Sequence, residues 1–189
     1  MYHTYKNGFI EVVCGPMFAG KTEELIRRIK RLEYAKQNVL VFKPAIDNRY
    51  SLKPEIVSHN LSKKPSIVVS SSSEILSQVE KDTHAVVIDE AQFFSSELVD
   101  VCNTLANRGI RVIVAGLDMD FSGKPFGPMP NLMAIAEEVT KVHAVCSETG
   151  DPALYSYRKG KNDNVVLLGK KNEYEPLSRK AFISKMKNK

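Results

Sequence analysis

The chain has 189 residues, of which 43% are apolar and 26% are charged, a balance that excludes wholesale disorder and fits one domain with a small appendage. The net charge of +5 is uneven, with ten Lys/Arg against three Asp/Glu from residue 158 to 189. A basic end of this kind is typically solvated and frayed, so nucleic acid is not an expected partner. No apolar run approaches the roughly 18 residues of a membrane span, and no membrane partner is expected.

Three cysteines at distant positions, Cys14, Cys102 and Cys146, disfavour a disulfide framework because their number is odd. A reducing compartment suits them better. The first residues also lack the apolar stretch of a signal peptide, so we expect a cytoplasmic protein.

The first two-thirds of the chain alternates apolar runs with amphipathic segments. In 22–37, apolar residues recur at helical spacing and predict a helix that buries one face. Apolar runs that end at a glycine or an acid predict strands buried on both faces. The expected elements are strand Phe9–Cys14, helix 22–37, strand Val39–Phe42, helix Glu74–Val79, strand Ala85–Ile88, helix Ser96–Asn107, strand Ile110–Ala115 and helix Pro130–Val139. This alternation predicts an α/β fold with a parallel sheet flanked by helices.

The pattern changes near residue 140. Val142–Cys146, Ala153–Tyr157 and Val165–Leu168 read as short strands joined by turns of Gly, Asp, Asn and Pro. We therefore expect residues 1–140 to form the α/β core and residues 141–189 to form a small β-rich domain with a basic tail.

The strongest motif follows the first predicted strand and fits G-x-x-x-x-G-K-[ST]. Its residues are Gly15, Pro16, Met17, Phe18, Ala19, Gly20, Lys21 and Thr22. Glycines let the backbone turn its N–H groups toward phosphate oxygens, and the following helix adds the positive end of its dipole. Lys21 is expected to reach the β- and γ-phosphates, and the Thr22 hydroxyl is expected to bind Mg²⁺. The motif lies between a strand and an amphipathic helix, so it predicts a phosphate-binding loop of a P-loop NTPase core.

A second motif is the apolar strand that ends in Asp89 and Glu90. An acid after a buried strand is the Walker B arrangement, in which the carboxylate holds Mg²⁺ directly or through water. Two adjacent acids allow two roles, with Asp89 on the metal and Glu90 as the base that takes a proton from an attacking hydroxyl.

Six motifs together resemble the type II, cytosolic thymidine kinases over nearly the whole chain. They are GPMFAGKT at 15–22, ELIRR at 24–28, DNRY at 47–50, IDEAQFF at 88–94, DFSGKPFG at 120–127 and KVHAVC at 141–146. The resemblance implies transfer of the ATP γ-phosphate to the 5′-hydroxyl of thymidine, giving dTMP. It also implies a P-loop core with a lasso loop that closes over the nucleoside, a homotetramer, and feedback inhibition by dTTP.

The resemblance assigns roles residue by residue. Glu90 matches the catalytic base. The remaining ATP-binding positions, beyond the phosphate-binding loop, are Asp47, Asn48, Arg49, Asp89, Glu90, Ala91 and Gln92. The expected nucleoside-binding positions are Phe121, Val165, Val166, Leu167, Leu168, Gly169 and Tyr174. Phe121 falls where the family stacks an aromatic ring on thymine, and 165–169 match the lasso.

The chain departs from the family at its structural zinc site. Four cysteines usually hold the metal, but here the positions are Cys146, Thr149, Ser178 and Ala181. One thiolate cannot form a closed tetrahedral site, so we expect no zinc. Packing among apolar side chains is the expected replacement, namely Val145, Leu154, Leu168, Leu177 and Phe182, with Pro176 stiffening the turn.

Two alternatives to a thymidine kinase stay open at this point. One is a deoxynucleoside kinase of shifted specificity, and acceptance of deoxyuridine is a related possibility because a methyl group is a small recognition element. The other is a P-loop ATPase module without kinase activity, with the basic tail as its contact to nucleic acid or protein.

Overall fold

A computed structural model describes residues 7–45, 55–57, 63–160 and 173–188. Side chains are described for 7–45, 65–160 and 173–188. Its main sheet has six strands in the order β5-β2-β6-β7-β1-β8, and every neighbouring pair is parallel. The strands are β1 Phe9–Cys14, β2 Asn38–Pro44, β5 Ile67–Val69, β6 Thr83–Ile88, β7 Arg111–Gly116 and β8 Glu138–Lys141. The expected α/β class is confirmed.

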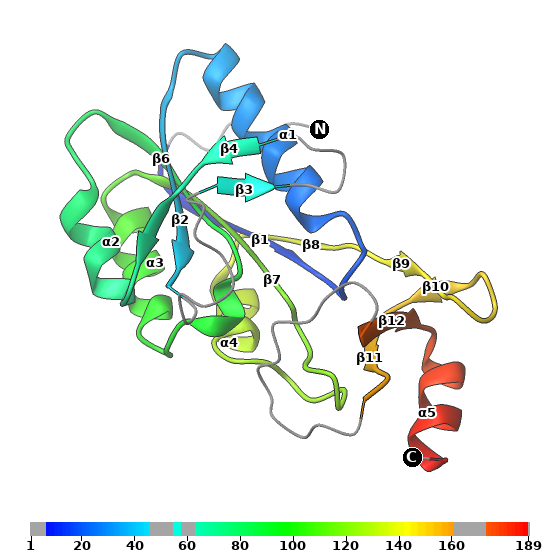
Figure 1. The fold of residues 1–189 in the computed structure, drawn as a ribbon. Helices are drawn as coiled ribbons and strands as arrows, with labels where there is room; N and C mark the ends of the chain where they lie inside the picture. The colour runs from blue at the N-terminus through cyan, green and yellow to red at the C-terminus, as the bar shows by residue number, and fades with distance from the viewer. Residues whose placement is uncertain (1–6, 46–54, 58–62, 161–172, 189) are drawn as a thin grey trace.

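Helices cover both faces of this sheet (Figure 1). The helix α1, Lys21–Tyr34, packs on one face, where Leu25, Ile29 and Leu32 are buried. The opposite face carries α2 Ser72–Gln78, α3 Leu98–Asn107 and α4 Met129–Ile135. Apolar side chains on both faces explain why the central strands read as continuous hydrophobic runs.

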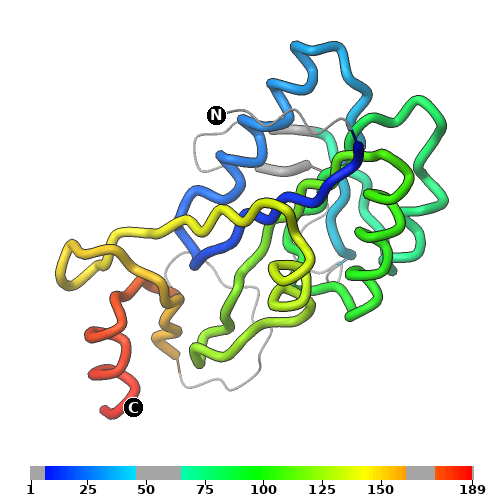
Figure 2. Tube along the Cα trace, turned by 180° about the vertical axis from the view of Figure 1, so that it is seen from behind, coloured from blue at the N-terminus to red at the C-terminus, as the bar shows by residue number. Residues whose placement is uncertain are grey.

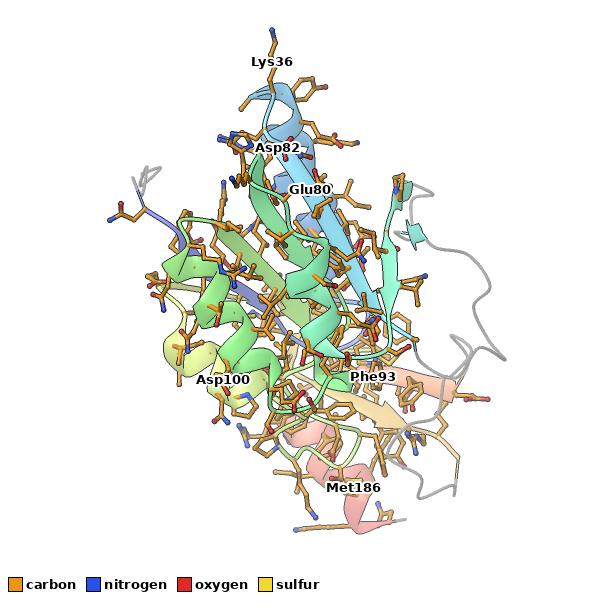
Figure 3. All side chains as sticks on the ribbon, turned by 90° about the vertical axis from the view of Figure 1, so that its left-hand side faces the viewer. Lys36, Glu80, Asp82, Phe93, Asp100 and Met186 are labelled. Atoms are coloured by element: carbon orange, nitrogen blue, oxygen red, sulfur yellow. The ribbon has the colours of Figure 1, made fainter. Side chains whose placement is uncertain are left out.

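The strand order determines which chain segments meet. Parallel strands all end at the same edge, and β7 lies between β6 and β1. The segments that leave these three strands therefore lie side by side at the carboxyl edge, the usual place of a ligand site in such sheets. Figure 3 shows Phe93 at this end of the molecule, and Lys36, Glu80 and Asp82 at the opposite end.

The C-terminal part projects from the sheet beyond β8, as Figure 2 shows. It contains two small antiparallel pairs and a helix: β9 Ala144–Val145 with β10 Pro152–Ala153, β11 Tyr155–Arg158 with β12 Tyr174–Leu177, and α5 Arg179–Lys187. A further antiparallel pair, β3 Glu55–Val57 with β4 Lys63–Pro65, lies apart from it. The boundary expected at residue 140 stays a prediction, and β8 of the main sheet runs through it to Lys141.

Two expectations about elements are wrong, and a third falls on residues that the structure does not describe. The helix expected to reach Val139 ends at Ile135, because the chain turns there and pairs with β1 as the parallel edge strand β8. The basic tail is helix α5 and is not frayed, because Ala181 and Phe182 are buried against the small hairpins. Residues 165–168, expected to be a strand, lie outside the described residues.

The packing expected in place of zinc is partly wrong. Val145 is 70% exposed, whereas Leu177 and Phe182 are buried. The aromatic side chain that the pattern missed is Tyr155, whose ring stacks on Phe182 with centroids 4.3 Å apart. Leu154 is partly buried against this cluster, and Leu168 lies outside the described residues.

A buried ionic network joins α1 to the sheet. Glu11, in the middle of β1, accepts hydrogen bonds from Arg28 of α1 and from Arg111 of β7. Arg28 also donates to Glu24 at 2.8 Å and to Thr140 of β8 at 3.0 Å. Because Glu11 and Arg28 are both buried, each charge depends on the other for compensation.

We predict that Arg28→Ala lowers the free energy of unfolding by about 3 kcal/mol, because the buried Glu11 carboxylate loses one of its two charged partners. Urea denaturation followed by circular dichroism measures the change. Arg27→Ala is the matched control: the neighbouring side chain is 54% exposed, also pairs with Glu24, and should cost less than about 1 kcal/mol. Equal losses in the two variants would contradict the importance of the buried network.

Candidate functional site

The phosphate-binding motif forms a tight loop between β1 and α1. Gly15 and Gly20 have φ values of 145° and 80°, which side chains rarely allow. A Cβ on Gly15 would lie 2.2 Å from the Val142 carbonyl oxygen, so a larger residue would displace the segment after β8. Phe18 also has a positive φ of 65°, although it has a side chain. Backbone strain of this kind tends to gather at functional sites.

Lys21 lies at the first position of α1 and turns back over the loop. Its Nζ donates to the Pro16 carbonyl oxygen at 2.7 Å. Burial lowers the pKa of Lys21, and the nearby carboxylates of Glu90 and Asp89 oppose that shift. The loop's ammonium group and the acids after β6 therefore share one electrostatic environment at the carboxyl edge.

The two adjacent acids after β6 have different surroundings. Asp89 is buried, and its Oδ1 accepts a hydrogen bond from the Glu90 N–H at 2.9 Å. Burial, and then the charge of Glu90, raise the pKa of Asp89 to about 7. Glu90 is exposed, and its backbone is in the left-handed region with φ of 53°. The two carboxylates are thus distinct in solvation, as two separate roles require.

Residues after Glu90 form a short 3₁₀ turn, η1 Ala91–Phe93, beneath the acids. Ala91 is fully buried. The Gln92 side chain is buried, and its Nε2 donates to Glu90 Oε2 at 2.5 Å. Gln92, which the sequence predicts to bind ATP, thus contacts Glu90.

The aromatic residues expected at the nucleoside are held together by an arginine. The Arg158 guanidinium lies 3.9 Å from the Phe121 ring centroid. Its Nε and Nη2 donate to the Tyr174 hydroxyl at 2.9 and 2.6 Å. Phe121 and Tyr174 are thus brought together from the loop after β7 and from β12. Sequence reasoning missed Arg158, because nothing in the local pattern of β11 distinguishes it from a surface arginine.

A second aromatic pair at this edge was also missed. Phe93 and Phe126 meet edge to face, with ring centroids 5.6 Å apart. Both belong to quoted motifs, IDEAQFF and DFSGKPFG, so their place in those motifs was the available signal. Gly123-Lys124, a second GK pair, lies in a turn between Phe121 and Phe126 and not in a loop that joins a strand to the start of a helix.

Eight expected site residues fall outside the part of the chain that the structure describes. Asp47, Asn48, Arg49 and the five residues Val165, Val166, Leu167, Leu168 and Gly169 lie outside the described residues. For these positions the roles inferred from the resemblance stay predictions.

The four positions that match the zinc ligands lie close to one another. The Thr149 hydroxyl and the Ser178 backbone contact Cys146, and together with other backbone groups they lower the pKa of its thiol to about 6. Ala181 packs in the same cluster as Cys146. Within 7–45, 65–160 and 173–188, no group of three or more His, Cys, Asp or Glu could hold a metal ion. The expected absence of zinc stays a prediction.

Comparison with known proteins agrees with the geometry. The family model described as Thymidine kinase matches residues 8–182. A thymidine kinase of Bacteroides thetaiotaomicron is 57% identical over 180 residues, which is 95% of this chain and 89% of that protein. A thymidine kinase of Bacteroides fragilis is 57% identical over 179 residues, with the same coverage of each chain.

Among solved structures, the Legionella pneumophila ATPase DotB superposes with a TM-score of 0.41 and 15% identity. The match covers 70% of this chain and 35% of that chain, and it is too low to bear on function. The family model and the two Bacteroides relatives span nearly the whole chain. The chain belongs to the thymidine kinase family.

Proposed function

We propose that this chain transfers the γ-phosphate of ATP to the 5′-hydroxyl of thymidine, giving dTMP and ADP. The observation that carries the proposal is the meeting of Lys21, Asp89 and Glu90 at one edge of the sheet, where both carboxylates influence the Lys21 pKa. Phosphoryl transfer needs a cation on the donor and a base on the acceptor within one cleft. The thymidine kinases that are 57% identical to the chain support thymidine as the acceptor.

The donor side consists of the loop Gly15–Thr22, with Asp47–Arg49 and Asp89–Gln92 as further ATP-binding segments. Loop amides and Lys21 hold the β- and γ-phosphates, so that the terminal phosphate points toward Glu90. In the structure, the Pro16 carbonyl accepts from Lys21 Nζ, and a phosphate oxygen would replace that carbonyl.

Mg²⁺ fits the residues on this side. Asp89 is a buried carboxylate whose raised pKa shows that its charge lacks full compensation. The Thr22 hydroxyl, in the first turn of α1, supplies a second hard oxygen ligand of the kind that Mg²⁺ prefers. Bound there, the ion would neutralise charge on the transferring phosphate.

Glu90 acts as the base. It takes the proton from the 5′-hydroxyl as that oxygen bonds to the γ-phosphorus, and the bond from γ-phosphorus to the bridging oxygen breaks to release ADP. Phe121 stacks on thymine, and Arg158 fixes the orientation of Phe121 and Tyr174. The 165–169 stretch supplies main-chain groups to the base edge.

Further properties are also proposed. The family resemblance supports a homotetramer and inhibition by dTTP, and the cysteine usage supports a cytoplasmic location. The change of pattern near residue 140 supports a core of residues 1–140 with a β-rich lasso domain at 141–189, and the departure from the family's four cysteines supports the absence of zinc. Among the helices that the described residues form, none is both long and apolar enough to span a membrane.

A nucleoside panel tests the proposed reaction. We expect labelled phosphate to pass from ATP to thymidine in the presence of Mg²⁺, with deoxyuridine a weaker acceptor because it lacks the 5-methyl group, worth roughly 1–3 kcal/mol. Thin-layer chromatography of the products measures the transfer. If another deoxynucleoside is phosphorylated in preference to thymidine, that nucleoside is the substrate. If DNA or RNA stimulates ATP hydrolysis and no nucleoside is phosphorylated, the protein is not a nucleoside kinase.

Glu90→Gln should lower kcat by roughly 10²–10⁴-fold, because the amide cannot accept the hydroxyl proton. ATP binding, measured by calorimetry, should stay within about threefold of the unmodified protein. Glu97→Gln, an exposed change at the start of α3, is the matched control and should leave kcat unchanged. Near-normal turnover of Glu90→Gln would show that Glu90 is not the base.

Asp89→Asn should stabilise the nucleotide-free protein at pH 8 by roughly 2–4 kcal/mol and change it little at pH 4. The folded-state pKa of about 7 lies above the ordinary value, so the folded protein retains a proton that the unfolded chain loses above about pH 4. Stability from this group is therefore lost as pH rises toward 7, and asparagine avoids that loss. Urea unfolding at pH 4 and pH 8 measures the free energy of unfolding of the variant and of the unmodified protein. The same difference at both pH values would contradict the raised pKa of Asp89.

Stabilisation by Mg²⁺ and ATP should disappear in the same variant, because the metal loses its carboxylate ligand. Thermal unfolding with and without the nucleotide measures that loss.

A further inference from the structure

Both ends of the Gln92 amide form hydrogen bonds, one with a backbone N–H and one with a carboxylate. The Oε1 atom accepts the Leu117 N–H at 2.9 Å, and the Nε2 atom donates to Glu90 Oε2 at 2.5 Å. The residue is 2% exposed. Its side chain therefore bridges the carboxylate after β6 to the first residue after β7.

The direction of this bridge follows from the chemistry of its two neighbours. A backbone N–H can only donate, so the atom that faces Leu117 must be the amide oxygen. The NH₂ group then faces Glu90, where an ionised carboxylate can only accept. The two contacts independently require the same orientation of the amide.

Gly116 leaves room for the Gln92 side chain, and Gly127 leaves room for the Gln92 backbone carbonyl. A Cβ on Gly116 would lie 2.7 Å from Gln92 Oε1, and a Cβ on Gly127 would lie 2.2 Å from the Gln92 carbonyl oxygen. Gly127 also has a φ of 52°, which favours glycine. The segments on both sides of the 117–127 loop thus pack directly on Gln92.

The Glu90 carboxylate needs such a support. Its residue is exposed and its backbone is in the left-handed region, so packing alone does not fix the side chain. The 117–127 loop carries Phe121, the aromatic residue that is proposed to stack on thymine. Gln92 is the direct hydrogen-bonded link between that loop and Glu90.

We propose that Gln92 is a positioning residue, which aims the Glu90 carboxylate and couples its orientation to the loop that receives the nucleoside. This inference rests on the proposed function and replaces the ATP contact expected for Gln92. Its side chain acts through Glu90, and its effect falls on turnover rather than on the affinity for ATP.

Two substitutions separate the two ends of the bridge. Gln92→Glu keeps an acceptor for Leu117 N–H but presents an oxygen to Glu90 in place of the donor. Gln92→Met has a similar length and loses both hydrogen bonds. Gln78→Met, at an exposed position of α2, is the matched control and should behave as the unmodified enzyme.

We expect Gln92→Glu to lower kcat roughly 10–100-fold, because misplacement of a catalytic group costs about that much. The KM for ATP should stay within about twofold. The acidic limb of the kcat/KM profile for thymidine should move to higher pH by about one unit or more, since a second carboxylate now faces Glu90. Gln92→Met should lose similar turnover and also raise the KM for thymidine, because the loop loses its anchor.

The outcomes are distinct. A normal kcat and pH profile in Gln92→Glu, with the unmodified enzyme active on thymidine, would overturn the positioning role and leave the kinase function intact. A raised KM for ATP with a normal kcat would show that Gln92 contacts the nucleotide, and it would also overturn the positioning role. An unmodified enzyme that phosphorylates no nucleoside would overturn the proposed function itself, and the inference with it.

Discussion

Parallel pairing of β6, β7 and β1 is the constraint on which the site depends. Because these strands share one direction, the phosphate-binding loop, the acids Asp89 and Glu90, and the 117–127 loop all begin at the same edge. The register is continuous, with Ile88 beside Val114 and Cys14 beside Gly116. The loop Gly15–Thr22 and the acids Asp89 and Glu90, about 70 residues apart in sequence, thus become neighbours although β1 and β6 are not paired with each other.

The edge of the sheet also tolerates buried charge because the charges compensate one another. Lys21 lies near Glu90 and Asp89, and Asp118, just after β7, pairs with Lys141 at 2.7 Å. Asp118 further raises the pKa of Lys21 through its charge. A buried charge without a partner would be costly, so the lysines offset part of the cost of burying these acids, although Asp89 still lacks full compensation in the absence of nucleotide.

The parts that could be predicted from sequence are those specified by neighbouring residues. The glycines of the loop, the apolar strands and the stripe of Leu25, Ile29 and Leu32 depend on local spacing, and the structure agrees with them. The strand β8 was missed because Glu-Val-Thr-Lys has no apolar run, and it forms only by pairing with β1. Helix α5 was missed because its stability comes from the contact of Phe182 with Tyr155, 27 residues earlier.

Side-chain partnerships across the fold were the least predictable part of the site. The motif IDEAQFF placed Gln92 near the nucleotide, but its two hydrogen bonds depend on where β7 ends. The contacts of Arg158 form only in the folded chain, where β12 and the loop after β7 bring Tyr174 and Phe121 next to it. No spacing rule within one segment encodes such contacts.

The strand β11 connects the donor and acceptor sides. Alternate residues of a strand point to the same face, so Ser156 and Arg158 project together. The Ser156 hydroxyl accepts the Met17 N–H of the phosphate-binding loop at 2.9 Å, and Arg158 contacts Phe121 and Tyr174. Both residues are buried, so a shift of β11 would disturb the loop and the aromatic residues together. The small C-terminal part therefore contributes to the geometry of both proposed substrate sites, and its packing around Tyr155 and Phe182 supports a site centred on the sheet.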